Sequence, residues 1–190
     1  MKIRPAVKAD APVLAELVNY AGEGMPLYLW SKLAAPGEDA WQIGRLRAER
    51  ETGAFSYRNA VVIEQGGEAA GCLIGYGISD QPGPIAADLP PMFVPLQALE
   101  NLAPATWYIN VIGVLPKFRN LGLGAKLLAL ADETARARGK RGISLIVADA
   151  NLGARRLYAR NGFRECASRK MVKEAWQSES ENWLLLTKEL

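Results

Sequence analysis

The chain has 190 residues, 49% of them hydrophobic, with a formal net charge of +3, no histidine and two cysteines. Such a chain is long enough for one domain with a substantial core, and it lacks the roughly 18 consecutive apolar residues of a membrane span. The missing apolar stretch leads us to expect no membrane as partner. The absence of histidine excludes Ser-His-Asp hydrolysis, imidazole acid–base catalysis and His-bearing metal sites, so we also expect no metal ion.

The N-terminal third predicts a strand followed by helices. Residues 2–7 have the pattern of a strand, and Asp10 is placed to cap a helix whose apolar residues recur at helical spacing. Residues 26–34 and 39–51 predict a second helical stretch that is broken at Pro36-Gly37. The N-terminus has no apolar export core, and with so few cysteines this predicts a cytoplasmic protein.

The middle of the chain predicts a hairpin and then an insertion. Apolar runs at 60–64 and 69–78 are joined by two glycines, which is typical of two antiparallel strands. Residues 79–104 contain six prolines and predict an insertion between strands, with room for a short helix at 92–101. An insertion of this length is either a functional lid or partner surface, or a disordered excursion.

The C-terminal half alternates strands and helices. We expect the central strand at 105–114, a helix at 124–138 that ends at Gly139 or Gly142, a strand at 143–148, a helix at 151–161, and strands near 165–172 and 183–187. The last apolar run either lies inside the sheet or forms a homodimer interface. No repeat is present, so we expect one domain over 1–190.

The connection between the central strand and the next helix predicts an anion site. Gly122 and Gly124 bring the backbone close to any ligand, and the first N–H groups of a helix have no partners of their own. A Walker loop is excluded because Lys126 is not followed by Ser or Thr, and the dinucleotide fingerprint is excluded by the large Leu127. The alternative is a glycine turn that only starts the helix.

Two blocks resemble the GNAT family of N-acetyltransferases. Arg119, Gly122 and Gly124 fit the acetyl-CoA signature of that family residue for residue, and residues 151–163 resemble its next block, with Asn, a Leu-Tyr pair and a closing Gly-Phe. The resemblance is good over residues 105–172 and looser elsewhere. It implies the α/β acyl-CoA N-acyltransferase fold, a mixed and mostly antiparallel sheet with splayed central strands flanked by helices.

The resemblance also implies acetyl-CoA as co-substrate and direct transfer of its acetyl group to an amine. The residues implied to bind it come from the central strand, the glycine turn and the second block: Ile112, Gly113, Val114, Arg119, Asn120, Leu121, Gly122, Leu123, Gly124, Ala125, Asn151 and Tyr158. Asn151 can equally be an ordinary helix cap. Neither cysteine has the basic neighbour of an activated thiol, so no covalent intermediate is expected.

For catalysis the resemblance points to Tyr158, which would donate a proton to the CoA thiolate as it leaves. The alternative is a packing role for Tyr158 on an amphipathic helix. Some relatives have a general base on the central strand, but residues 105–114 contain no carboxylate. Tyr108 and Asn110 are polar side chains that alternate onto one face with Ile112, and a water relayed by them could accept the proton.

The acceptor is expected to be a small-molecule or peptide amine. Glu23, Tyr28 and Trp30 lie where similar enzymes shape the acceptor pocket, although aromatic residues at such spacings also form core. Two alternatives stay open for the whole protein. A noncatalytic acyl-CoA sensor fits the missing strand carboxylate, and a nucleic-acid binder fits the basic excess from 113 to 173, which a CoA site explains without any nucleic-acid motif.

Overall fold

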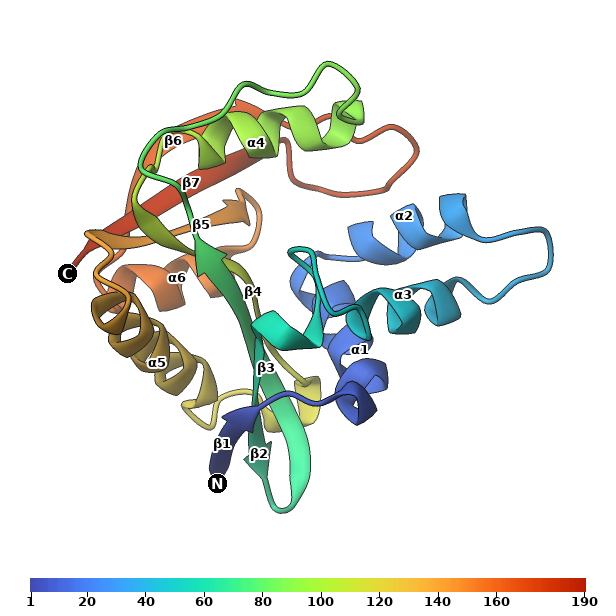
Figure 1. Cartoon of the computed structure of the whole chain (residues 1–190), viewed down its shortest axis with the longest axis horizontal. Helices are drawn as coiled ribbons and strands as arrows, with labels where there is room; N and C mark the ends of the chain where they lie inside the picture. Colours follow the sequence, from blue (N-terminus) through green and yellow to red (C-terminus); the bar gives the residue numbers. More distant parts are fainter. The chain divides into compact units, whose positions relative to one another are not determined.

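A computed structural model describes residues 1–190, which divide into two compact units. The first unit consists of Met1–Gly75 and Asn110–Leu127, and the second of Tyr76–Ile109 and Leu128–Leu190. Three elements have residues in both units: β3 (Glu68–Gly77), β4 (Thr106–Val114) and α5 (Leu123–Ala137) (Figure 1).

The seven strands follow the order β1-β2-β3-β4-β5-β7-β6 in one sheet. The remaining strands are β1 (Lys2–Pro5), β2 (Ala60–Gln65), β5 (Gly142–Ala148), β6 (Arg164–Lys170) and β7 (Asn182–Glu189). Strand β4 pairs in parallel with β5, whereas β1–β2, β2–β3, β5–β7 and β6–β7 are antiparallel. The predicted mixed and mostly antiparallel α/β fold is therefore confirmed.

The helices also lie where the sequence predicts them. They are α1 (Ala11–Ala21), α2 (Met25–Leu33), α3 (Ala40–Ala48), α4 (Val94–Glu100) and α6 (Leu152–Arg160), with short 3₁₀ turns at Lys8–Asp10, Tyr57–Asn59, Pro91–Phe93 and Pro116–Phe118. None of them combines the length and the apolar character that crossing a bilayer requires.

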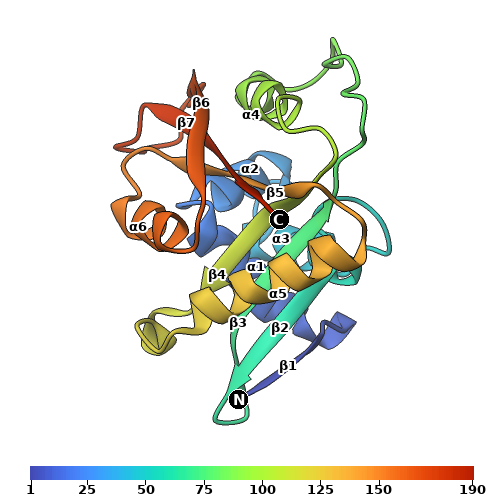
Figure 2. The same cartoon turned by 90° about the vertical axis from the view of Figure 1, so that its left-hand side faces the viewer.

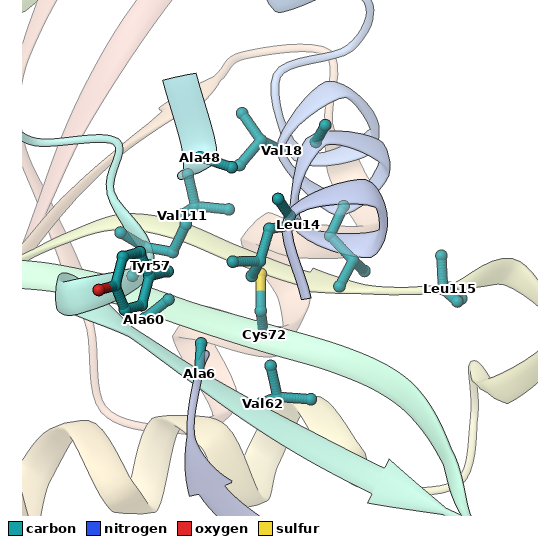
Figure 3. Packing of buried hydrophobic residues seen from close by; sticks show 14 of the residues in the cluster. Ala6, Leu14, Val18, Ala48, Tyr57, Ala60, Val62, Cys72, Val111 and Leu115 are labelled. Atoms are coloured by element: carbon teal, nitrogen blue, oxygen red, sulfur yellow. The ribbon is translucent and has the colours of Figure 1, made fainter. Parts of the chain in front are cut away.

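The first unit has its core between α1 and the β2–β3 hairpin (Figure 3). Leu14 of α1 and Val62 and Cys72 of the hairpin are fully buried there. Burial raises the pKa of the Cys72 thiol to about 12, because no charge lies near enough to stabilise a thiolate. The hairpin turns through Gly66 and Gly67 with φ values of 62° and 85°, as its two glycines predict.

Asp10 corrects one detail of the prediction. It precedes α1, but its carboxylate accepts no hydrogen bond from the N–H groups of that helix. Instead it accepts two hydrogen bonds from the Arg4 guanidinium, at 2.7 and 2.9 Å, and one from the Val7 N–H at 2.8 Å. The backbone of Asp10 is already helical, with φ −81° and ψ −5°, so its side chain turns back toward β1.

In the second unit the insertion folds into a packed helix. Helix α4 lies against β5, β6 and β7 (Figure 2), and Met92 and Leu99 are almost fully buried. The predicted short helix is thus confirmed. Helix α5 ends where predicted, at Gly139 with φ 62°, and the Lys140 N–H donates to the Ala135 carbonyl at 3.0 Å, which forms a Schellman cap.

Close packing of β3 predicts the effect of one added methyl group. A Cβ at Gly71 would lie 2.6 Å from the backbone oxygen of Gly113, which cannot move as a flexible side chain can. We expect Gly71→Ala to lower the free energy of unfolding by about 1–3 kcal/mol, measured by urea denaturation. The control is Gly83→Ala, where nothing lies within 4 Å. Equal stability of the two variants would contradict the packing argument.

Candidate functional site

The glycine turn of the first unit leads into the N-terminus of α5. Asn120 and Gly122 adopt φ values of 61° and 75°, and residues 120–122 are exposed. The Lys126 N–H donates to the Gly122 oxygen at 3.2 Å. The N–H groups of Leu123, Gly124 and Ala125 precede this hydrogen bond, and no side chain caps them. A helix start without such caps carries a partial positive charge, as an anion site requires.

Arg119 adds a full positive charge beside this turn. Its Nε donates to the Val114 carbonyl at 3.2 Å, and its guanidinium carbon lies 5.9 Å from the centre of the Tyr20 ring. These two contacts come from β4 and α1, so they restrict where the exposed guanidinium can point. The predicted cofactor residue Arg119 is thus held at the turn that it was predicted to serve.

Tyr20 also lines a groove between α1 and α3. The groove has a volume of about 540 Å³ and is lined by Pro12, Val13, Glu16, Asn19, Tyr20, Trp41 and Arg45. Arg45 is paired with Asp39 at 2.8 Å, so its charge is partly satisfied outside the groove. Sequence analysis did not single out this groove, because its walls come from residues more than 20 positions apart.

Strand β4 alternates as the sequence predicts near its C-terminal end. Asn110, Ile112 and Val114 are half-buried, whereas Val111 and Gly113 are buried. A Cβ at Gly113 would lie 3.0 Å from the Leu17 backbone oxygen, so glycine lets α1 pack closely on this strand. This close packing is sufficient to explain why residue 113 is a glycine, independently of any ligand that its backbone binds.

Tyr158 lies in the second unit, on α6, and only 7% of its surface is exposed. Its ring packs against Phe163 with centroids 5.8 Å apart. No residue of the chain hydrogen-bonds its hydroxyl, yet the oxygen is not sealed from solvent. Burial raises the pKa of Tyr158, so the phenol is protonated at neutral pH and able to donate a proton. This is the state required of an acid.

Asn151 is the N-cap of α6. Its Oδ1 accepts a hydrogen bond from the Ala154 N–H at 3.1 Å, so the capping alternative is confirmed. The predicted contact of Asn151 with a cofactor stays a prediction.

Tyr108 belongs to a buried cluster that sequence analysis described only in part. The ring of Tyr108 lies 5.4 Å from that of Tyr76 in β3, and the Tyr76 hydroxyl donates to Oε2 of Glu100 at 3.1 Å. Burial raises the pKa of each of these three groups. Glu100 was overlooked although it is the one acidic residue of the short predicted helix, which is a signal that the sequence did contain.

The three predicted acceptor residues have different surroundings. Glu23 is exposed between α1 and α2 with φ 53°, and Tyr28 is half-buried with the Lys32 ammonium 5.6 Å from its ring centre. Trp30 is only 3% exposed and packs against Trp41 and Phe55. The structure therefore places Trp30 in the core of the first unit. This agrees with the alternative that aromatic residues at such spacings form core, and not with the prediction that Trp30 lines an acceptor pocket.

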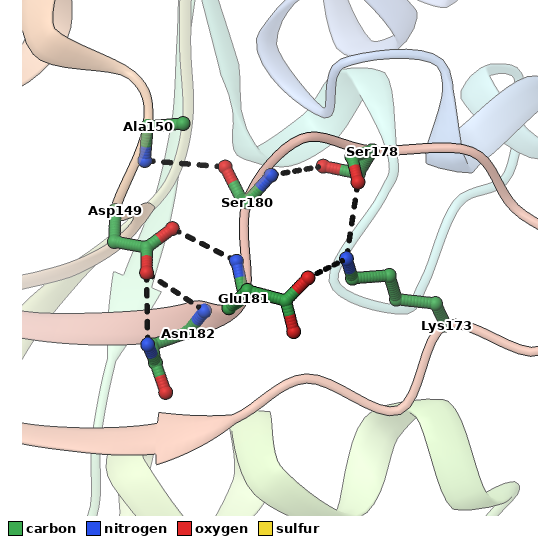
Figure 4. Close-up of polar contacts among 7 residues, drawn as sticks. All are labelled: Asp149, Ala150, Lys173, Ser178, Ser180, Glu181 and Asn182. Carbon is green, nitrogen blue, oxygen red and sulfur yellow. Dashed lines mark hydrogen bonds and ion pairs between the residues drawn. The ribbon is translucent and has the colours of Figure 1, made fainter.

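A network of hydrogen bonds joins the end of β5 to the loop before β7 (Figure 4). The Asp149 carboxylate accepts from the Glu181 N–H at 3.0 Å, the Asn182 N–H at 3.0 Å and the Asn182 Nδ2 at 2.9 Å. Ser180 is fully buried, and its hydroxyl accepts from the Ala150 N–H at 3.2 Å. The loop is thus tied to the residues that immediately precede α6.

The basic excess is partly neutralised by ion pairs. Lys117 pairs with Glu68, Lys173 with Glu181 at 2.7 Å, and Lys188 with Asp132 at 2.6 Å. The Lys140 ammonium donates instead to the Ile78 carbonyl at 2.8 Å. Arg119 has no carboxylate partner, so its charge is available to a ligand.

Comparison with known families decides the assignment. Residues 27–163 match the model of the acetyltransferase (GNAT) family. The chain belongs to the GNAT acetyltransferase family. The matched range includes both the glycine turn and the block around Tyr158, so the resemblance predicted from those blocks is confirmed. No curated protein sequence matches this GNAT chain significantly.

Solved structures agree with the GNAT fold. A crystal structure of an acetyltransferase is similar over 100% of this chain and 99% of its own, with 25% identity and a TM-score of 0.67. An N-acetyltransferase from Staphylococcus aureus Mu50 covers 98% of this chain and 100% of its own, with 18% identity and a TM-score of 0.65. A GNAT acetyltransferase from Elizabethkingia anophelis has 22% identity, with 69% and 75% covered and a TM-score of 0.52.

The Asp149 network predicts a pH-dependent contribution to stability. Burial raises the pKa of Asp149, but hydrogen bonds from Asn182 and Glu181 outweigh it and hold the pKa below its usual value. A lowered folded-state pKa stabilises the protein at neutral pH, and this stabilisation is lost as the pH falls through that pKa. We expect Asp149→Ala to lower the free energy of unfolding by about 1–3 kcal/mol at pH 7 and by less at pH 3.

Urea denaturation at both pH values measures this difference. Asp88→Ala is the control, because Asp88 is exposed and makes no ion pair. A loss of stability that is the same at pH 7 and pH 3 would contradict the charged network.

Proposed function

We propose that this GNAT protein transfers the acetyl group of acetyl-CoA directly to an amine. The observation that carries the proposal is the uncapped N-terminus of α5 at the exposed turn that follows Arg119, whose guanidinium has no carboxylate partner. CoA contains a diphosphate, and a dianionic group of this kind is bound by backbone N–H groups together with an arginine. Two similar structures, from Elizabethkingia anophelis and Bacillus anthracis, hold acetyl-CoA, which supports the same ligand here.

In this proposal the N–H groups from Asn120 to Ala125 and the Arg119 side chain bind the diphosphate. The backbone of Ile112, Gly113 and Val114 offers N–H and C=O groups to the pantetheine arm, as a pairing strand would. Leu121 is exposed at the turn, and the side chain of Leu123 is buried and anchors the helix start. Glycine at 122 and 124 keeps side chains away from the phosphate oxygens.

The proposed reaction is one nucleophilic substitution. The neutral amine attacks the thioester carbonyl, the C–N bond forms, and the C–S bond breaks as CoA leaves as a thiolate. The nitrogen loses one N–H proton as it becomes an amide, and this proton restores the Tyr158 hydroxyl after Tyr158 has protonated the sulfur. The Tyr158 hydroxyl donates its proton to that sulfur, which suits a buried phenol without a hydrogen-bond partner in the chain. The buried Cys72 thiol has its pKa raised to about 12, which favours direct transfer over a cysteine-bound intermediate.

The acceptor in this proposal is a small-molecule or peptide amine. Glu23 and Tyr28 offer a carboxylate and an aromatic face, which are the groups that attract an ammonium ion. Trp30 is a core residue and supports the helix that carries Tyr28. Tyr108 and Asn110 are the polar side chains of β4 that can orient the amine or a water.

The first prediction from this proposal concerns CoA binding at Gly122. A Cβ at Gly122 meets nothing within 4 Å, so a side chain there enters the space that the diphosphate would occupy. We expect Gly122→Leu to weaken CoA binding at least about tenfold, which is about 1.4 kcal/mol, by isothermal titration calorimetry.

Gly139→Leu is the matched control. Gly139 also has a positive φ and open space, so both variants suffer the same backbone strain, but Gly139 lies at the opposite end of α5. Equal CoA affinity of the two variants, or no heat with the unmodified protein, would contradict the proposed cofactor site. CoA binding without thiol release on an amine panel would instead support the noncatalytic sensor.

The second prediction concerns Tyr158 as the acid. Tyr158→Phe keeps the ring that packs on Phe163 and removes only the hydroxyl. We expect kcat for thiol release to fall by about 10²- to 10⁴-fold while CoA affinity is unchanged. Tyr57→Phe is the control, because it removes a hydroxyl that is hydrogen-bonded to Glu51. Full activity of Tyr158→Phe would show that another group protonates the thiolate.

A further inference from the structure

The proposed transfer needs a base, because an amine is largely an ammonium ion at neutral pH and must lose a proton before it attacks. Strand β4 has no carboxylate between Thr106 and Val114 that could take this proton. In the second unit, a carboxylate is linked to Tyr108 of that strand through the Tyr76 side chain. It is Glu100, and it comes from α4 in the Pro-rich insertion.

We propose that Glu100 is the general base of acetyl transfer and that the Tyr76 hydroxyl relays the acceptor's proton to it. This assignment rests on the proposed acetyltransferase function. It gives the insertion at 79–104 a chemical role, which is to deliver a carboxylate to strands that have none.

The geometry of the cluster supports a relay. The Tyr76 hydroxyl donates to Oε2 of Glu100 at 3.1 Å, and its ring packs on Tyr108 with centroids 5.4 Å apart. Tyr108 in turn lies close enough to Tyr158 and Glu100 for their charges to affect its ionisation. The relay and the proposed base are therefore in direct contact within the second unit, beside Tyr108.

The surroundings of Glu100 adapt it to accept a proton. Burial raises the pKa of Glu100, and this outweighs the opposite effect of hydrogen bonds from Tyr76 and Gln97. No lysine or arginine forms an ion pair with it, whereas the carboxylates of Asp10 and Glu181 are held by basic partners. A carboxylate with a raised pKa is a stronger base and is still ionised at a pH above that value.

Tyr76 is suited to pass a proton on rather than to keep a negative charge. Burial raises the pKa of Tyr76, and the charge of Glu100 raises it further, so a free tyrosinate is disfavoured. The hydroxyl can accept a proton on its oxygen while it gives its own proton to the carboxylate. The two transfers then occur together, and Tyr76 stays neutral throughout.

One N–H bond of the acceptor ammonium breaks, and its proton passes to the Tyr76 oxygen as the Tyr76 proton passes to Oε2 of Glu100. The amine keeps the electron pair and uses it to form the C–N bond. After transfer, Glu100 carries one extra proton, which it loses to water before the next turnover.

A purely structural role is the competing explanation, because the same hydrogen bond ties α4 to β3. The two roles differ in what they change. A structural tie affects the stability of the protein, whereas a base affects kcat and the acid side of the pH–rate profile. Glu100→Gln separates them, because glutamine has the same shape and can still accept the Tyr76 hydrogen bond.

The test is thiol release from acetyl-CoA with tyramine, spermidine and trialanine as probe amines. We expect Glu100→Gln and Tyr76→Phe each to lower kcat about 10²-fold or more, with CoA affinity unchanged. In the unmodified enzyme the rate should fall at acid pH as Glu100 is protonated, and Glu100→Gln should lose this dependence. Glu133→Gln is the control, since Glu133 is exposed on α5 and has no ion-pair partner.

A carboxyl titration by ¹³C NMR gives a second readout that needs no acceptor. We expect the pKa of Glu100 to lie above its usual value and to rise further in Tyr76→Phe, because the Tyr76 hydrogen bond lowers it. An ordinary pKa for Glu100, or full activity of Glu100→Gln at all pH values, would overturn the assignment while leaving the acetyltransferase function intact. No thiol release by the unmodified protein with any probe would count against the proposed function, and the titration would still decide the state of Glu100.

Discussion

The start of α5 is the constraint on which the proposed function depends. A helix must leave its first N–H groups without intrahelical partners, and this one leaves them at an exposed glycine turn without a capping side chain. Serine or aspartate at this place would satisfy these N–H groups and leave none for the proposed anion. The helix therefore starts without a side-chain cap, and its N–H groups stay available to an anion. Arg119, held by Val114 and Tyr20, strengthens the same preference.

The fold was largely predictable because its signals are local. Hydrophobic spacing identifies the helices, paired glycines identify the β2–β3 hairpin, and Gly139 identifies the end of α5. The two motif blocks also predicted the family, and the family model matches residues 27–163, which include both blocks. Asp10 was harder, because its partner Arg4 lies on another element and outcompetes the helix N–H groups that sequence alone suggests.

The candidate site was predictable only where a motif marks it. The turn at 119–125 and Tyr158 belong to contiguous blocks, whereas the contact between Tyr76 and Glu100 joins residues 24 positions apart through the fold of the insertion. Trp30 illustrates the opposite limit. Its aromatic character suits a binding pocket and a core equally well, and only its burial beside Trp41 and Phe55 separates the two.

The different surroundings of the two sulfhydryl groups have a practical consequence. Cys72 is fully buried, with its pKa raised to about 12, whereas Cys166 is exposed on β6. Alkylating reagents require the thiolate and access to it, so they should modify the folded protein at a single position. That position offers a handle for attaching one fluorophore or spin label per chain without mutagenesis. It also means that the native protein contributes one reactive sulfhydryl to any colorimetric measurement of liberated thiol.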